Sequence, residues 1–81
     1  MNDISQAVAL RIRELLKEKG ITQYRLEQKM GLSHDTVKSI MKGKTRGVNL
    51  KTVAIIAEGL GVTLSGFLDS ELFLYGNLNI D

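Results

Sequence analysis

Four glycines divide most of the sequence into short segments in which apolar residues recur at helical spacing. They are Gly20, Gly31, Gly43 and Gly61. A residue that can cap the next helix follows each of them, in the order Thr22, Ser33, Asn49 and Thr63. Glycine is favoured just past the end of a helix, and Ser, Thr and Asn are favoured just before the start of one. The sequence therefore predicts several short helices joined by tight connections.

Five helices fit this pattern, and each presents apolar residues three and four positions apart. We expect them over residues 3–19, 23–30, 34–42, 50–60 and 64–68, with Asn2 or Asp3 capping the first. The chain contains no proline, and the alternation typical of strands is almost absent before residue 71. With 81 residues the chain is long enough for one small domain with a thin core. The predicted fold class is all-α.

Residues 71–81, ELFLYGNLNID, have a different pattern. Gly76-Asn77 can form the two-residue turn of a β-hairpin. An extension of the fifth helix competes with the hairpin, and so does a frayed tail or a strand packed on its own core. Unless this tail folds back, its apolar side chains would be exposed on a monomer, which favours a subunit contact. The candidate dimer contacts are Phe73, Tyr75, Leu78 and Ile80.

Charge is distributed unevenly along the chain, although the net charge is only +2. No acidic residue lies between Asp35 and Glu58, and this window holds Lys38, Lys42, Lys44, Arg46 and Lys51. The sequence after Lys51 contains acids but no base. An electropositive end suits a polyanion such as DNA. A solvated lysine-rich face explains the charge pattern equally well.

The composition argues against several classes of protein. The chain has one histidine and no cysteine, and it lacks both a phosphate-binding glycine motif and a usefully spaced carboxylate pair. We therefore expect neither an enzyme nor a metal, cofactor or small-molecule site. Charged residues interrupt the first twenty positions, and no apolar stretch is long enough for a membrane span. The expected location is the prokaryotic cytoplasm, in association with the nucleoid.

The second and third helices are linked only by Met30-Gly31-Leu32-Ser33, so they must cross steeply. This geometry, over residues 22–42, is a helix-turn-helix, whose second helix can enter a DNA major groove. On helix 34–42 the apolar side is formed by Val37, Ile40 and Met41. The opposite side carries His34, Asp35, Lys38 and Ser39, with Thr36 at its margin. Lysine can donate to guanine, aspartate can accept from cytosine, and hydroxyls can serve several bases.

The stretch GITQYRLEQKMGLSHDTVKSIMKGKT resembles the helix-turn-helix pattern of the Cro/C1-type (Xre family) regulators. NLKTVAIIAEGLGVTLSGFLD is similar to that family's next two helices, so the likeness covers roughly residues 4–68. The resemblance implies a five-helix, lambda-repressor-like domain over residues 1–70, followed by the tail of residues 71–81. It also implies a sequence-specific transcriptional regulator that binds double-stranded DNA, with repression expected over activation. Because one recognition helix reads only a few base pairs, we expect a homodimer on a palindromic operator, with the tail as the candidate contact. An antitoxin-like or phage-encoded protein-interaction module, with secondary DNA binding, is the alternative that the apolar tail favours.

The resemblance also implies roles for individual residues. Base-reading positions are His34, Asp35, Thr36, Lys38 and Ser39, and phosphate-binding positions are Gln23, Lys42, Lys44, Thr45, Arg46 and Asn49. Gln23 stands where the family has a glutamine that holds a phosphate and positions the recognition helix. Simpler roles remain open for three of these residues. Asp35 can complement the helix dipole, Thr36 can serve the helix cap, and Gln23 can be solvated at the first helical position.

Two positions depart from the family pattern. Glu27 replaces a small residue, often alanine, that faces the neighbouring helix. We expect Glu27 either to bend outward or to find a cation such as Lys38. Many relatives pair a glutamate at the end of the third helix with an arginine of the first, where this chain has Met41 and Leu16. An apolar contact is expected to replace that ion pair, a change that is often neutral for stability.

Overall fold

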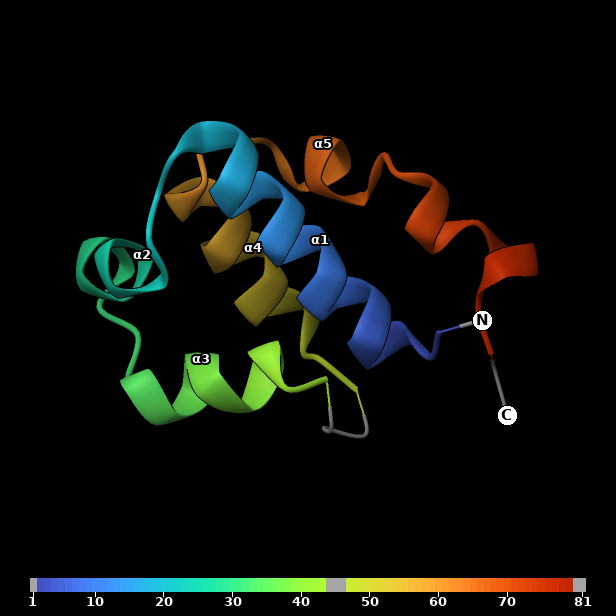
Figure 1. The fold of residues 1–81 in the computed structure, drawn as a ribbon, viewed down its shortest axis with the longest axis horizontal. Helices are drawn as coiled ribbons and strands as arrows, with labels where there is room; N and C mark the ends of the chain where they lie inside the picture. The colour runs from blue at the N-terminus through green and yellow to red at the C-terminus, as the bar shows by residue number, and fades with distance from the viewer. Residues whose placement is uncertain (1, 44–46, 80–81) are drawn as a thin grey trace.

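A computed structural model of the chain describes residues 2–43 and 47–79 and shows a helical domain (Figure 1). Its elements are α1 (Ile4–Lys19), α2 (Gln23–Met30), α3 (His34–Met41), α4 (Leu50–Gly59), α5 (Leu64–Leu68) and the short 3₁₀ turns η1 (Glu71–Phe73) and η2 (Tyr75–Asn77). The all-α prediction and the order of the five helices are confirmed. The third and fourth helices end one residue earlier than expected. None of the described helices has the length and apolarity needed to cross a membrane.

The helix starts are fixed by side-chain caps at all the predicted positions. Each capping side chain accepts a hydrogen bond from a backbone N–H of the first turn, and the caps are Asp3, Thr22, Ser33, Asn49 and Thr63. At α1 the Gln6 side chain also accepts from the backbone N–H of Asp3, which completes a capping box. The four predicted glycines all have positive φ angles, between 65° and 76°. Local sequence signals therefore determine where these helices begin and end.

The helices enclose one apolar core. α1 packs against α3, α2 packs against both α3 and α4, and α4 packs against α5. The largest fully buried apolar side chains are Ile12, Leu26, Val37, Ile56, Leu60 and Phe67, which come from all five helices. Figure 1 shows α2 at the end of the domain away from the tail, with α3 running from it along one side. The core thus holds α3 by one side only.

Gly59 lies where α4 approaches α2 most closely. A Cβ atom at this position would come within 2.5 Å of both Leu26 Cδ1 and Met30 Cγ. Real Cβ atoms do not approach other heavy atoms this closely. The close contact between α2 and α4 therefore requires a glycine, which has no side chain, at position 59.

The C-terminal tail folds back on the domain without forming a hairpin. Residues 71–77 form two 3₁₀ turns, and Leu78 makes an isolated parallel bridge with Asn2. Asn79 donates its backbone N–H to the Asn2 carbonyl oxygen over 2.8 Å. Both the hairpin and the extension of the fifth helix are therefore wrong for residues 71–79. The physical reason is tertiary, because Phe73 turns inward and stacks on Phe67 with ring centroids 6.1 Å apart.

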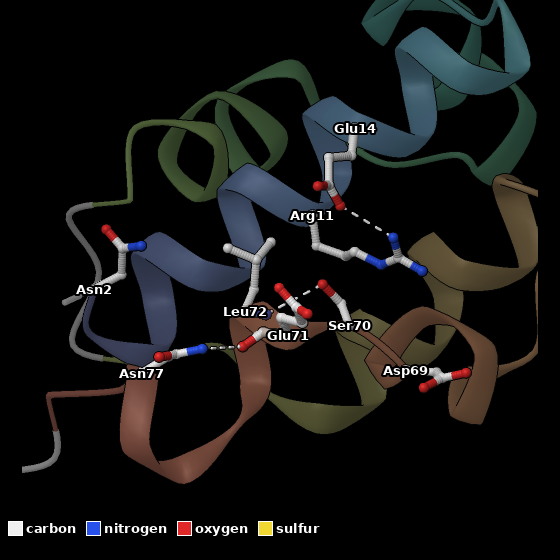
Figure 2. A pocket seen from close by; sticks show the side chains of 8 residues that line it. All are labelled: Asn2, Arg11, Glu14, Asp69, Ser70, Glu71, Leu72 and Asn77. Atoms are coloured by element: carbon white, nitrogen blue, oxygen red, sulfur yellow. Dashed lines mark hydrogen bonds and ion pairs between the residues drawn. The ribbon is translucent and has the colours of Figure 1, made fainter.

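Arg11 connects α1 to the end of α5 at a shallow surface pocket (Figure 2). Its guanidinium donates to the carbonyl oxygens of Phe67 and Gly66, over 2.8 and 3.0 Å, and pairs with Glu14 at 3.0 Å. Ser70 caps the η1 turn nearby by accepting from the Leu72 N–H. Each of the three guanidinium nitrogens of Arg11 thus has a partner within the protein. The pocket therefore lies where the tail meets α1.

Candidate nucleic-acid interface

The α2–α3 unit has the compact geometry of a helix-turn-helix. Gly31 ends α2 with a φ of 65°, and its N–H donates to the Glu27 carbonyl. Only two residues then separate Gly31 from α3, and Ser33 caps that helix through the Thr36 N–H. The left-handed backbone conformation that ends a helix and turns the chain at a single residue strongly favours glycine. α3 is thereby set at a fixed angle beside α2 (Figure 1).

α3 has one buried side and one exposed side. Val37, Ile40 and Met41 are at most 7% exposed. The predicted base-reading residues are all exposed, namely His34, Asp35, Thr36, Lys38 and Ser39. An eight-residue helix is about 12 Å long, close to the width of a major groove. The exposed side can thus present four or five polar side chains to one groove.

Glu27 bridges the two helices of this unit. Its carboxylate is 8% exposed and accepts from His34 Nδ1, with Oε2 at 3.0 Å and Oε1 at 3.2 Å. The Gln23 side-chain amide donates to the same Oε2 atom over 3.0 Å. A carboxylate removed from water needs such partners, because an unpaired buried charge is strongly destabilising. Glu27 thus connects the start of α2 to the start of α3.

This arrangement corrects the expectation for Glu27. The side chain does not bend outward, and its partner is His34 rather than Lys38. Gln23 bonds to Glu27 and not directly to α3, and its roles in holding a phosphate and in positioning the recognition helix stay predictions. At the other departure from the family pattern, Met41 belongs to the apolar core and Leu16 packs against that core, so both positions are apolar and at least partly buried. A direct contact between Met41 and Leu16 in place of the ion pair stays a prediction.

The C-terminal end of α3 is fixed by α1. Arg13 donates from its guanidinium to the Met41 carbonyl oxygen over 2.7 Å. Gly43 follows with a φ of 65°, and a Cβ atom there would lie 3.3 Å from the Gln6 Cα. Both ends of α3 are therefore positioned by side chains or backbone of other helices.

The predicted phosphate-binding residues that the structure describes all lie at helix ends. Gln23 is the first residue of α2 and Lys42 is exposed at the end of α3. Asn49 caps α4, where its Oδ1 accepts from the Lys51 N–H over 2.7 Å. Lys44, Thr45 and Arg46 lie outside the described residues. The Thr36 hydroxyl is 2.7 Å from the Ser33 hydroxyl, so Thr36 takes part in the cap of α3 while staying exposed.

The predicted dimer residues do not form one exposed surface. Phe73 is half-buried against the core and Leu78 is half-buried at its bridge with Asn2. Tyr75 is 78% exposed, and its neighbour Leu74 is 58% exposed. Ile80 lies outside the described residues. Part of the predicted contact is therefore used within the domain, which the sequence alone does not reveal.

Comparison with known proteins identifies the unit formed by α2 and α3. The helix-turn-helix family model HTH_3 matches residues 12–67, which include both helices and their turn. The chain belongs to the helix-turn-helix family. This confirms the resemblance to the Cro/C1-type proteins. No curated protein sequence matches the chain.

Two solved structures share the fold of this helix-turn-helix domain. The crystal structure of the prophage Lp1 protein 11 superposes with a TM-score of 0.81 at 22% identity, over 90% of this chain and 96% of that one. An HTH_3 family transcriptional regulator from Vibrio cholerae gives a TM-score of 0.74 at 23% identity. That match covers 85% of this chain and 38% of the regulator. At these identities the likeness concerns the fold.

Sequence reasoning missed two residues that shape this helix-turn-helix. Arg13 is one of the charged residues within the first twenty positions, and nothing in the sequence pattern indicates that it bonds the end of α3. Glu27 was recognised as unusual, but its partner was not found. The available signal was spacing, because Glu27 lies four residues after Gln23 on one face of α2, and His34 starts the next helix.

Proposed function

We propose that this chain is a sequence-specific DNA-binding transcriptional regulator, with residues 1–70 as the binding domain. The observation that carries the proposal is the exposed polar side of α3, opposite a side that is fully packed in the core. A helix held in this way can enter a major groove without loss of packing. Family membership supports the same class of function.

In this proposal α3 reads bases through His34, Asp35, Lys38 and Ser39. Lysine supplies donors for guanine O6 and N7, and a carboxylate supplies an acceptor for cytosine N4. Phosphates on either side of the groove are held by Gln23 at the start of α2 and by Lys42 at the end of α3. Phosphate contacts set the register of the protein on DNA, whereas base contacts set the sequence.

We further propose a homodimer that represses transcription from a palindromic operator. One eight-residue helix touches only a few base pairs, so useful specificity calls for two copies. Their half-sites would lie about 10 base pairs apart, or one turn of DNA. The exposed Tyr75 and Leu74 are available for the contact between copies.

The experiment that tests the proposal is a fluorescence-anisotropy titration with a randomised duplex pool at two salt concentrations, followed by sequencing of the bound fraction. Enrichment of a palindrome with strong salt dependence is expected. The variant Lys38→Ala should reduce this binding, and its matched control is Lys17→Ala, which removes an exposed lysine from α1. Absence of binding at low salt would contradict the proposal.

A protein-interaction module of antitoxin-like or phage origin is the second candidate. Exposure of Leu68, Leu74 and Tyr75 favours it, because these apolar side chains lie in α5 and the tail, away from α3. Under this alternative the changes Leu74→Ser and Tyr75→Ser would abolish binding of the protein partner and leave any DNA binding intact.

A further inference from the structure

Three side chains at the junction of α2 and α3 form a hydrogen-bonded chain, with a buried carboxylate in the middle and an exposed imidazole at the start of α3. Gln23 donates to Glu27, and Glu27 accepts from His34. The carboxylate of Glu27 is 8% exposed, whereas the His34 side chain is 65% exposed. The imidazole thus has one nitrogen fixed by the protein and most of its surface free.

The two ring nitrogens of His34 have different roles in this geometry. A carboxylate oxygen only accepts, so the proton of the neutral ring lies on Nδ1, where it is donated to Glu27. The hydrogen bond made by one nitrogen of an imidazole decides which nitrogen carries the proton. The second nitrogen, Nε2, then has a free lone pair and acts as an acceptor.

We propose that Glu27 is a specificity-determining positioning residue, which fixes the neutral His34 ring with Nε2 as an acceptor and so directs it to a donor on a base edge. In the major groove the donors are adenine N6 and cytosine N4, whereas guanine offers acceptors at O6 and N7. The inference rests on the proposed DNA-binding function. It adds the chemical group that His34 recognises and the residue that determines it.

Preorganisation strengthens this role. The imidazole is held at 3.0 Å from a carboxylate that is itself held by Gln23, so its orientation is set before DNA arrives. A side chain that is already ordered loses less conformational entropy on binding. Loss of Glu27 frees the ring to rotate and to take the Nε2–H form, in which Nε2 donates. That form suits guanine.

The first test is spectroscopic and needs no DNA. The chain contains a single histidine, so the long-range ¹H–¹⁵N spectrum of the uniformly labelled protein reports His34 alone. It is recorded at alkaline pH, where imidazoles are neutral. We expect the Nδ1–H tautomer in the native protein and a shift to Nε2–H in Glu27→Ala. A native Nε2–H tautomer, or an unchanged spectrum in the variant, would overturn the inference.

Two control variants show whether the tautomer depends on Glu27 itself, and not on the loss of a negative charge or of a phosphate contact. Glu18→Ala removes an exposed carboxylate of α1, matches the charge change and should leave the spectrum unchanged. Gln23→Ala removes the amide behind Glu27 and should weaken DNA binding, while the Nδ1–H tautomer persists. A tautomer that followed Gln23 or Glu18 instead of Glu27 would also count against the inference.

The second test is selection from a randomised duplex pool at the same alkaline pH. The base position read by His34 is the one whose preference disappears in His34→Ala. At that position the native protein should favour adenine or cytosine, and Glu27→Ala should shift the preference to guanine by about threefold to tenfold, the scale of one hydrogen bond. An unchanged preference despite the tautomer shift would overturn the role in recognition. Failure of the native protein to bind any duplex would overturn the proposed function itself, whatever the spectrum shows.

Discussion

Arg13 on α1 donates a 2.7 Å hydrogen bond to the carbonyl oxygen of Met41, at the last turn of α3. The last carbonyls of a helix have no partner within that helix, so a guanidinium from outside satisfies one of them. Together with the Glu27–His34 contact at the other end, this bond sets the orientation of α3 within the domain. The exposed side of α3 is thus positioned by residues that do not themselves belong to it.

The change Arg13→Ala should lower the free energy of unfolding by about 1 to 2 kcal/mol, because it removes a charged donor from a partly buried carbonyl. Urea denaturation measures the change. Lys17→Ala is the control, since it removes an exposed cation from the same helix and should stay within about 0.5 kcal/mol of the native value. Equal effects of the two changes would mean that the bond to Met41 contributes nothing specific.

The change Gly59→Ala should destabilise the domain although alanine is the better helix former. A Cβ atom would meet Leu26 and Met30 at 2.5 Å, so α2 and α4 must separate or repack. Overpacking of this kind costs about 1 to 3 kcal/mol, against a gain of up to about 1 kcal/mol in helix propensity. Gly76→Ala meets no atom within 4 Å and serves as the control in thermal unfolding. A Gly59→Ala protein as stable as the native one would show that the α2–α4 contact adapts freely.

The tail offers a matched pair of aromatic residues. Phe73→Ala should cost about 2 to 3 kcal/mol of stability, because the ring packs on Phe67 and the core. Tyr75→Ala should leave the stability of a monomer almost unchanged, since its side chain is 78% exposed. Chemical denaturation compares the two, and sedimentation at several concentrations asks whether Tyr75 contributes to association. A larger effect of Tyr75 than of Phe73 on monomer stability would contradict the observed packing.

Local sequence signals predict the helices of this domain because caps and glycine stops act within a few residues. Thr22 and Ser33 each bond a backbone N–H three residues ahead, so their effect does not depend on the rest of the fold. In the tail, as far as the structure describes it, the one such cap, Ser70, starts only the short turn η1. The conformation of the tail follows from contacts with Phe67, in the buried part of α5, and with Asn2 at the other end of the chain. Neither contact can be read from the pattern of residues 71–79.

In the candidate site, too, some features can be predicted from the sequence and others cannot. Helical periodicity predicts which residues of α3 are exposed, because the buried stripe leaves the opposite side to solvent. It does not predict the partner of Glu27, since that depends on the angle between two helices and on a rotamer choice. Side-chain contacts across a turn are a property of the packed structure.

The proposed division between base-reading and phosphate-binding residues can be tested by the salt dependence of DNA binding. Lys42→Ala should weaken binding to all duplexes alike and reduce the slope of log K against log salt by about 0.9, because one phosphate contact is lost. The same is expected for Lys44→Ala and Arg46→Ala. Ser39→Ala should keep the slope and change the preferred base at one position. Salt-dependent titrations on an enriched and a random duplex measure both quantities, with Lys17→Ala as the control for charge. If Lys42→Ala and Ser39→Ala acted identically on the two duplexes, the assignment of separate roles to the exposed side and the end of α3 would be wrong.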